Sequence, residues 1–132
     1  MVVNILRAGK IIDHKVSEIL RELGLTHIQF NILRILEAEH PRKLSLGEVT
    51  DGLLFATSDV SRLIDRLVNH GFVSREVCPK NRRQIDLGIT DEGFRVIRRA
   101  VPKIADSLHG YYRESISEKE RQVVIDIMKR IN

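Results

Sequence analysis

Several features that mark common protein classes are scarce in this sequence of 132 residues, which has one cysteine and no tryptophan. The single cysteine, Cys78, has no partner for an internal disulfide, which argues against a small secreted domain held together by disulfides. No apolar run approaches the roughly 18 residues of a membrane-spanning helix. The N-terminal segment lacks the long apolar stretch and cleavage signal of a secretory leader. We therefore expect a cytoplasmic protein without a membrane span.

Motifs for catalysis and for metal binding are missing as well. The sequence has no glycine-rich phosphate loop, no G-x-S-x-G motif and no evident pair of carboxylates in an apolar setting. The five histidines show neither H-x-x-x-H nor Cys-His spacing. They are His14, His27, His40, His70 and His109. We therefore expect no enzymatic activity, no metal and no cofactor. A metal-sensing or redox-sensing regulator, the latter using Cys78, remains an alternative.

The charge balance is moderately basic. Lysine and arginine number 22 against 18 acidic residues, which gives a net charge of +4 and a pI near 9.5. This excess suits a polyanionic partner but does not by itself require one. Its position is more informative, because Lys80, Arg82 and Arg83 fall within the segment CPKNRR at residues 78–83. At the tip of a loop, such long side chains reach away from the protein body.

An amphipathic helix is predicted shortly before this basic segment, between a candidate N-cap at Thr57 and a glycine stop at Gly71. Apolar residues at spacings of three and four predict its buried face. These residues are Val60, Leu63, Ile64 and Leu67. The opposite face carries Ser58, Ser61, Arg62 and Asp65. An α-helix with such a free polar face fits the major groove of DNA.

Segments on both sides complete a DNA-binding pattern. Ser45 and Glu48 form a capping box that predicts a short helix through about Leu54. Two strand-like segments, residues 72–77 and 84–90, flank the basic loop and predict a β-hairpin. A short helix, a turn, a longer helix and a hairpin make a winged helix-turn-helix, which predicts DNA binding. A winged-helix module that binds proteins is the alternative, although it has no need for arginines at a hairpin tip.

Further amphipathic helices are predicted towards both ends of the chain. Capping boxes at Thr26 and Ser117 and an N-cap at Thr90 mark helix starts, and Pro102 is expected to kink or open its helix. Three apolar stripes have heptad-like spacing. They are Ile5-Ile12-Val16-Ile19-Leu23, Phe94-Ile97-Val101-Ile104-Leu108 and Val123/Val124-Ile127-Ile131. Because one small lobe cannot bury all three stripes, we interpret them as the interface of a homodimer.

Three segments, taken in this order, resemble the MarR family of winged helix-turn-helix regulators. They are LTHIQFNILRIL at 25–36, VSRLIDRLVNHGFVSR at 60–75 and NRRQIDLGITDEG at 81–93. The resemblance covers nearly the whole chain and implies a mainly α fold with a small β-wing (α+β). The implied order is two helices, a strand, two helices, a strand, the wing, a strand and two helices. It also implies a single domain, 1–132, with a DNA-binding lobe at 25–90 and dimerisation helices at 1–24 and 91–132.

The same resemblance implies a function. The chain would be a transcriptional regulator, acting as a repressor that binds a pseudo-palindromic operator in double-stranded DNA as a homodimer. In this family a small phenolic or aromatic effector often binds between the dimerisation helices and the DNA-binding lobe. The operator, the regulated genes and the identity of any effector are not contained in the sequence.

The resemblance also implies roles for single residues. Arg83 matches the wing arginine that enters the minor groove, and Arg62 matches a position that reads bases in the major groove. The full set of expected DNA contacts is Thr57, Ser58, Ser61, Arg62, Arg66, Lys80, Arg82 and Arg83. A competing interpretation places Arg62 or Arg66 in surface ion pairs, with Asp65 as the nearby acid.

Two positions depart from the family pattern, which usually has aspartate where this chain has Cys78 and Asn81. An aspartate at position 81 would orient the guanidinium group of Arg83. Asn81 offers only a neutral acceptor, which leaves the orientation of Arg83 open.

Overall fold

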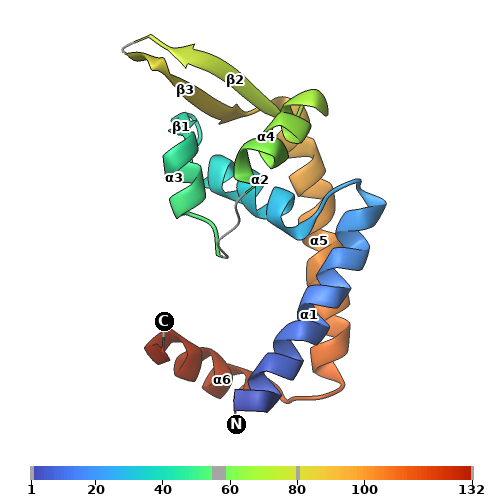
Figure 1. The fold of residues 1–132 in the computed structure, drawn as a ribbon. Coiled ribbons are helices and arrows are strands. Elements are labelled where there is room, and N and C mark those ends of the chain that lie inside the picture. The colour runs from blue at the N-terminus through green and yellow to red at the C-terminus, as the bar shows by residue number, and fades with distance from the viewer. Residues whose placement is uncertain (1, 55–58, 80, 132) are drawn as a thin grey trace.

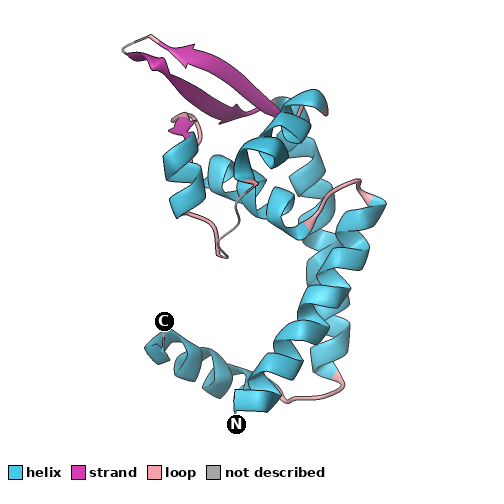
Figure 2. Cartoon of the chain, in the orientation of Figure 1, coloured by secondary structure: helices cyan, strands magenta, loops and turns pink. Residues whose placement is uncertain are grey.

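The computed structural model describes residues 2–54, 59–79 and 81–131, a mainly helical chain with one small sheet (Figures 1 and 2). The elements are α1 (Val2–Glu22), α2 (His27–Glu39), β1 (Leu44–Ser45), α3 (Leu46–Asp51), α4 (Val60–Asn69), β2 (Val73–Cys78), β3 (Asn81–Ile89), α5 (Asp91–Arg113) and α6 (Glu118–Ile131). The β2–β3 wing projects at one end, and α6 lies at the opposite end of the long α1–α5 pair (Figure 1). The predicted fold class and element order are confirmed.

Capping side chains set where several helices begin. The capping boxes predicted at Thr26 and Ser45 are both present, each with its two reciprocal hydrogen bonds. Ser117 likewise donates its backbone N–H to the Glu120 carboxylate at 2.8 Å. The start predicted for the fourth helix is wrong, because α4 begins only at Val60. The preceding residue, Asp59, has a non-helical backbone (φ −107°, ψ 23°), and Thr57 lies outside the described residues.

The three strands form an antiparallel sheet in the order β1-β3-β2, so β3 is central. Leu87 of β3 lies between Leu44 of β1 and Arg75 of β2. A register shift between Val77 and Cys78 interrupts the regular pairing near the outer end of the wing. The sheet is therefore anchored to the helices at its inner end, and the outer end of the hairpin projects from them.

One hydrophobic core connects α1, α2, α3, α4, the sheet and α5. Its largest fully buried side chains are Leu20, Ile32, Leu33, Leu36, Leu67, Leu87, Ile97 and Val49. Two of the stripes predicted to lie outside the core are partly buried in it, because Val16 and Ile97 are core residues, whereas Ile19 is only half-buried. The C-terminal half of α1 and the N-terminal half of α5 thus belong to the same core as the helix-turn-helix.

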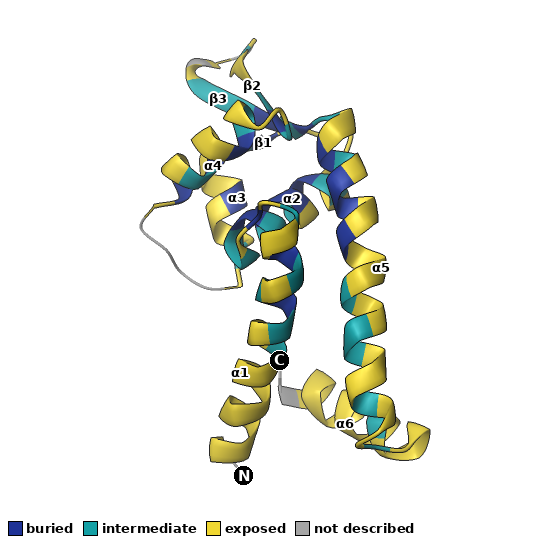
Figure 3. Cartoon of the chain, turned by 90° about the vertical axis from the view of Figure 1, so that its right-hand side faces the viewer, coloured by how far each residue is buried: buried dark blue, intermediate teal, exposed yellow. Residues whose placement is uncertain are grey.

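The outer parts of the terminal helices are exposed (Figure 3). On α1 and α6 the exposed large apolar side chains are Val2, Val3, Ile5, Leu6, Ile11, Val123, Val124, Ile125, Ile127 and Met128. Leu6 is 68% exposed and Val123 52% exposed, values unusual for aliphatic side chains on one surface. The α5 helix continues through Pro102 without interruption, so this proline does not open it, and a kink there stays a prediction.

The junction between α4, the sheet and α5 explains the I-T-D-E-G sequence that ends the third motif. Gly71 has φ 74° and ends α4 as predicted, since the Phe72 N–H then bonds back to the Leu67 carbonyl at 2.9 Å. Thr90 donates its hydroxyl to the Gly71 carbonyl at 2.6 Å and accepts the Gly93 N–H at 3.0 Å. A Cβ atom at Gly93 would lie 2.3 Å from the Phe72 carbonyl oxygen. This close backbone approach requires glycine.

Candidate nucleic-acid interface

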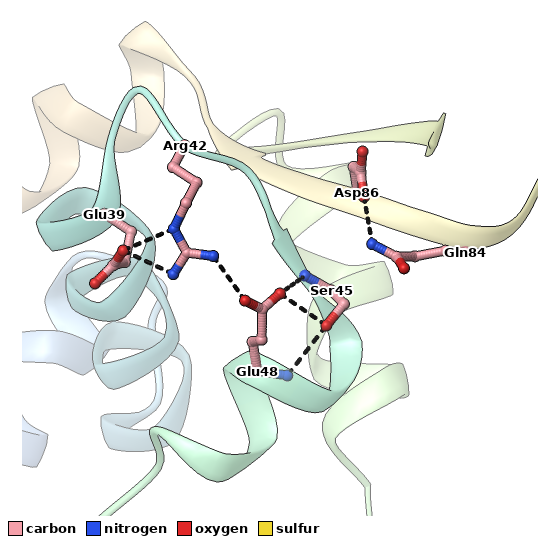
Figure 4. Close-up of polar contacts among 6 residues, drawn as sticks. All are labelled: Glu39, Arg42, Ser45, Glu48, Gln84 and Asp86. Carbon is pink, nitrogen blue, oxygen red and sulfur yellow. Dashed lines mark hydrogen bonds and ion pairs between the residues drawn. The ribbon is translucent and has the colours of Figure 1, made fainter. Parts of the chain in front are cut away.

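The α3 helix is held against the end of α2 by a small charged network (Figure 4). Arg42 donates to Glu39 at 2.7 Å and to Glu48 at 2.6 Å. Glu48 also accepts the Ser45 backbone N–H at 2.8 Å. The Ser45 N–H and then the Arg42 guanidinium lower the pKa of Glu48 to about 2. Glu48 is therefore ionised at neutral pH and fixes the first helix of the helix-turn-helix.

The α4 helix presents one polar face to solvent, as predicted. Val60, Ile64 and Leu67 are buried, and Leu63 is half-buried against the core. The exposed face carries Ser61, Arg62, Asp65 and Arg66. Ser58, which was expected on this face, lies outside the described residues together with Thr57. The polar face of α4 is therefore accessible to a partner from Val60 to Asn69.

The wing differs from the prediction in where its basic residues lie. Arg82 and Arg83 were expected in a loop, but β3 begins at Asn81, so both belong to the strand. Pairing of Cys78 with Asn81 across the hairpin shortens the turn and causes this difference. Lys80 lies outside the described residues, and only the backbone of Arg82 is described.

The side chain of Asn81 has a local role that its sequence position did not reveal. Its Oδ1 atom accepts the backbone N–H of Arg83 at 3.1 Å. The amide therefore shapes the start of β3 and acts on the Arg83 backbone. The Arg83 side chain is exposed and reaches the hollow between the wing and the helices.

That hollow has a volume of about 250 Å³ and is bounded by α3, α4, β2 and β3. Ser45, Ser61, Arg75, Arg83 and Gln84 provide its polar lining, with Leu46, Gly47, Ile64, Ile85 and Leu87 as the remaining residues. Arg75 and Arg83 approach it from the two strands of the wing. The site thus brings together Ser61 and Arg83, two of the predicted contacts from different elements.

The cations around this surface fall into two groups. Arg62, Arg66 and Arg83 are exposed and have no ion pair among the described residues. In contrast, Arg42, Lys43 and Arg75 are each paired with a carboxylate. The alternative in which Asp65 holds Arg62 or Arg66 is wrong, because Asp65 pairs with Arg75 of β2 at 2.6 Å. Three of the predicted contacts therefore keep a net positive charge for a partner.

Sequence reasoning missed the paired residues of the wing. Arg75 and Glu76, consecutive on β2, contact Asp65 and Lys43 respectively. No local spacing marks these pairs, since their partners are 10 and 33 residues away in the sequence. The strand order, with β1 and β2 on either side of β3, brings Lys43 and Glu76 together, and the packing of α4 on β2 brings Asp65 and Arg75 together.

Three other expectations concern metal binding, thiol chemistry and membrane insertion. Within residues 2–54, 59–79 and 81–131, no three His, Cys, Asp or Glu side chains gather as candidate metal ligands. Cys78 is a free, half-buried thiol at the end of β2. None of the described helices combines the length and the apolar character needed to cross a membrane.

Comparison with known proteins decides the family. A profile described as MarR family matches residues 4–84, more than half of the chain. The chain belongs to the MarR family. Members of the MarR family are winged-helix transcriptional regulators, and the family is not one of enzymes. The fold, with its wing and long terminal helices, agrees with this assignment.

Three of the similar proteins illustrate the likeness in sequence and fold. PapX of Escherichia coli, an HTH-type transcriptional regulator, is 30% identical over 94 residues, which are 71% of this chain and 57% of PapX. The chain thus matches less than two thirds of the length of that relative. Sco3205 of Streptomyces coelicolor, a MarR family regulator solved in complex with DNA, is 27% identical, with a TM-score of 0.80 and coverage of 97% and 81%. BpsR of Bordetella bronchiseptica has a TM-score of 0.82 at 20% identity, with coverage of 99% and 92%.

Proposed function

We propose that this chain is a sequence-specific DNA-binding regulator that represses transcription as a homodimer in the cytoplasm. The observation that carries the proposal is the group of unpaired arginines on one surface. Arg62 and Arg66 on α4, and Arg83 on the adjacent wing, have no carboxylate partner in the part of the chain that the structure describes. Sco3205, a similar MarR family regulator solved in complex with DNA, supports DNA as the partner.

The roles of these residues follow from their elements. Ser61 and Arg62 lie on the exposed face of α4 and suit the major groove, where an arginine pairs with two acceptors of guanine. Arg66, one turn further along α4, suits a backbone phosphate. Arg83 on the projecting wing suits the adjacent minor groove, where narrow A·T tracts attract arginine. Thr57, Ser58, Lys80 and Arg82 complete the proposed contacts as predictions from the sequence.

The dimer is proposed to form through α1, α5 and α6, the helices at residues 1–24 and 91–132. The exposed aliphatic side chains of α1 and α6 need an apolar partner, and the other described elements do not cover them. A second copy of the chain supplies the same surface in a two-fold arrangement. Two-fold symmetry would place the recognition helices about 34–36 Å apart, matching an inverted repeat in DNA.

A small aromatic acid is the proposed effector class. In BpsR, 6-hydroxynicotinic acid regulates the binding of DNA. In this chain a hollow of about 470 Å³ lies between α1 and α5, lined by Lys15, Glu18, Ile19, Arg21, Glu22 and Ser107. Because Arg21 already lies 4.0 Å from Glu18, Lys15 is the proposed partner of a ligand carboxylate, while a ring lies against Ile19. An effector at this place contacts α1 and α5, both of which belong to the proposed dimerisation helices.

Sequence selection from random duplexes, followed by binding assays, tests the DNA assignment. Arg83→Ala should weaken binding to the selected site by about 1–3 kcal/mol, and Arg62→Ala should relax base preference at one position of each half-site. Arg34→Ala removes the same charge from an exposed position on α2, outside both the proposed DNA surface and the proposed dimer helices, and is the matched control. Absence of any selected sequence would favour the rival, a winged-helix module that binds protein. Equal losses for Arg83→Ala and Arg34→Ala would also contradict the proposed surface.

Sedimentation tests the dimer. The full chain should sediment as a dimer at micromolar concentration, and removal of residues 113–132 should shift it to monomer and strongly weaken operator binding. A full-length monomer that still binds its operator tightly would refute the homodimer. Circular dichroism of the shortened chain distinguishes a lost interface from a lost fold.

A further inference from the structure

The wing has few apolar anchors along its outer part. On β2, Val73 is buried and Ser74 half-buried, whereas Arg75, Glu76 and Val77 are exposed. Consecutive residues of a strand point to opposite faces, so Arg75 and Glu76 reach out on different sides of the sheet. Each of these two side chains forms an ion pair with a different element.

The first ion pair joins the wing to the proposed recognition helix. Arg75 donates from Nη1 to Oδ1 of Asp65 on α4 at 2.6 Å. Asp65 lies on the same exposed face of α4 as Arg62, and Arg75 lines the same hollow as Arg83. The pair thus links the two elements that carry the proposed base-reading and minor-groove arginines.

The second ion pair holds the other face of the wing. Glu76 of β2 accepts from Lys43, which lies just before β1, so the lysine side chain must cross the central strand β3. Gly88 of β3 leaves space for this crossing. A Cβ atom at Gly88 would lie only 3.4 Å from Cγ of Lys43 and 3.0 Å from Oγ of Ser74. A larger residue at position 88 would therefore crowd the Lys43 and Ser74 side chains on this face of the sheet.

We propose that the Asp65–Arg75 and Lys43–Glu76 pairs are two braces that fix the orientation of the wing, the first against α4 and the second against the segment before β1. Asp65 and Glu76 are then positioning residues for Arg83, an inference that rests on the proposed DNA-binding function. Both pairs are substantially exposed, with side-chain exposures of 43% and 50% for Arg75 and Asp65. Exposed pairs add little to global stability. Their effect is expected in the affinity for DNA, where Arg62 and Arg83 must contact one duplex at the same time. Only the fraction of molecules with a correctly oriented wing can bind in this way.

Two carboxylate substitutions test the proposal, because the direction of the change in DNA affinity separates positioning from simple electrostatics. Asp65→Asn and Glu76→Gln each remove a negative charge near the proposed DNA surface, so simple electrostatics predicts tighter binding. The braces predict the opposite, a weakening of about two- to fivefold per wing, since a surface pair of this kind biases orientation only modestly. Asp59→Asn on the same helix is the control, because Asp59 is exposed without an ion pair among the described residues. Tighter binding by all three variants would overturn the proposal.

A double-mutant cycle separates positioning from direct contact by Arg75. If Arg75 acts through Asp65, Arg75→Gln should weaken binding in the wild type but add little loss in the Asp65→Asn background. The exchanged pair Asp65→Arg with Arg75→Asp should recover much of the affinity lost by either single change. Fully additive losses, or no recovery in the exchanged pair, would show that Arg75 contacts DNA itself and would overturn its positioning role.

A measurement without DNA keeps the two proposals distinguishable. Cys78 is the sole cysteine and ends β2, so a nitroxide attached there reports wing motion by its electron paramagnetic resonance line shape. The label should be more mobile in Asp65→Asn and Glu76→Gln than in the wild type or Asp59→Asn, with the thermal midpoint of unfolding nearly unchanged. Identical line shapes in all four proteins would overturn the braces. Failure of the wild type to select any DNA would overturn the proposed function alone.

Discussion

Replacing Gly93 by alanine should destabilise the lobe, although alanine is normally the better helix former. The new Cβ would lie 2.3 Å from the Phe72 carbonyl oxygen and 2.7 Å from Cγ1 of Ile89. Carbon and oxygen approach to about 3.3 Å in favourable contacts, so α5 or the Phe72 backbone must move by about 1 Å. The Phe72 oxygen cannot move freely, because it accepts the Thr90 N–H at 3.1 Å.

The magnitude follows from two opposing effects. Overpacking against a held backbone group costs about 3 kcal/mol, the upper part of the usual range. Alanine recovers about 1 kcal/mol of helix propensity relative to glycine. The net loss is therefore about 2 kcal/mol, which for a chain of this length lowers the unfolding midpoint by about 7 °C.

Urea denaturation and thermal unfolding followed by circular dichroism would measure this loss at fixed protein concentration. Gly47→Ala in α3 is the matched control, since its Cβ would meet only Oγ of Ser45 at 3.9 Å. The control should be neutral or stabilising by up to about 1 kcal/mol. If Gly93→Ala were as stable as Gly47→Ala, the close approach at the α5 start would not be the reason for this glycine.

Three further outcomes are expected. The pKa of Glu48 is lowered to about 2 from a usual 4.5, so the stabilisation by its carboxylate is present above pH 4.5 and is lost as the pH falls towards 2. Glu48→Gln should therefore flatten the acid-unfolding curve between these pH values. An unchanged curve would contradict the network. Leu20→Ala should cost about 2–5 kcal/mol in urea unfolding. Ile5→Ala, at the exposed end of the same helix, should leave the lobe folded and raise the dissociation constant of the proposed dimer in sedimentation. Equal destabilisation by Leu20→Ala and Ile5→Ala would argue against a division of α1 into a buried half and an exposed half. Thr90→Val keeps the shape of the side chain but removes two hydrogen bonds, so the free energy of unfolding in urea should fall by about 1–3 kcal/mol. An unchanged free energy of unfolding would show that neither bond contributes.

Local patterns allowed much of the helical structure to be predicted. Capping boxes depend on residues three positions apart, so Thr26 and Ser45 could be assigned from the sequence. The buried face of α4 depends on the helical repeat and was also correct. The start of β3 was predicted incorrectly, because the pairing of Cys78 with Asn81 depends on the partner strand and not on the basic character of the segment.

The candidate site was predictable only in part for the same reason. Exposure of Arg62 and Arg66 follows from their places on one helix. The ion-pair partner of Asp65 could not be predicted in this way, because Arg75 follows only after the chain turns at Gly71 and enters β2. Contact of these arginines with DNA remains a prediction for the binding experiments.

The division of α5 between two environments has a mechanical consequence. Its first half, with Val96, Ile97 and Ala100, is embedded in the core, whereas its second half extends towards α6. A continuous helix of 23 residues is about 35 Å long. It acts as a lever, so a tilt of about 5° at the outer end displaces the opposite end by about 3 Å. In the proposed homodimer, small adjustments at the interface would thus produce larger displacements of the wings, and the length of α5 would set how much larger they are.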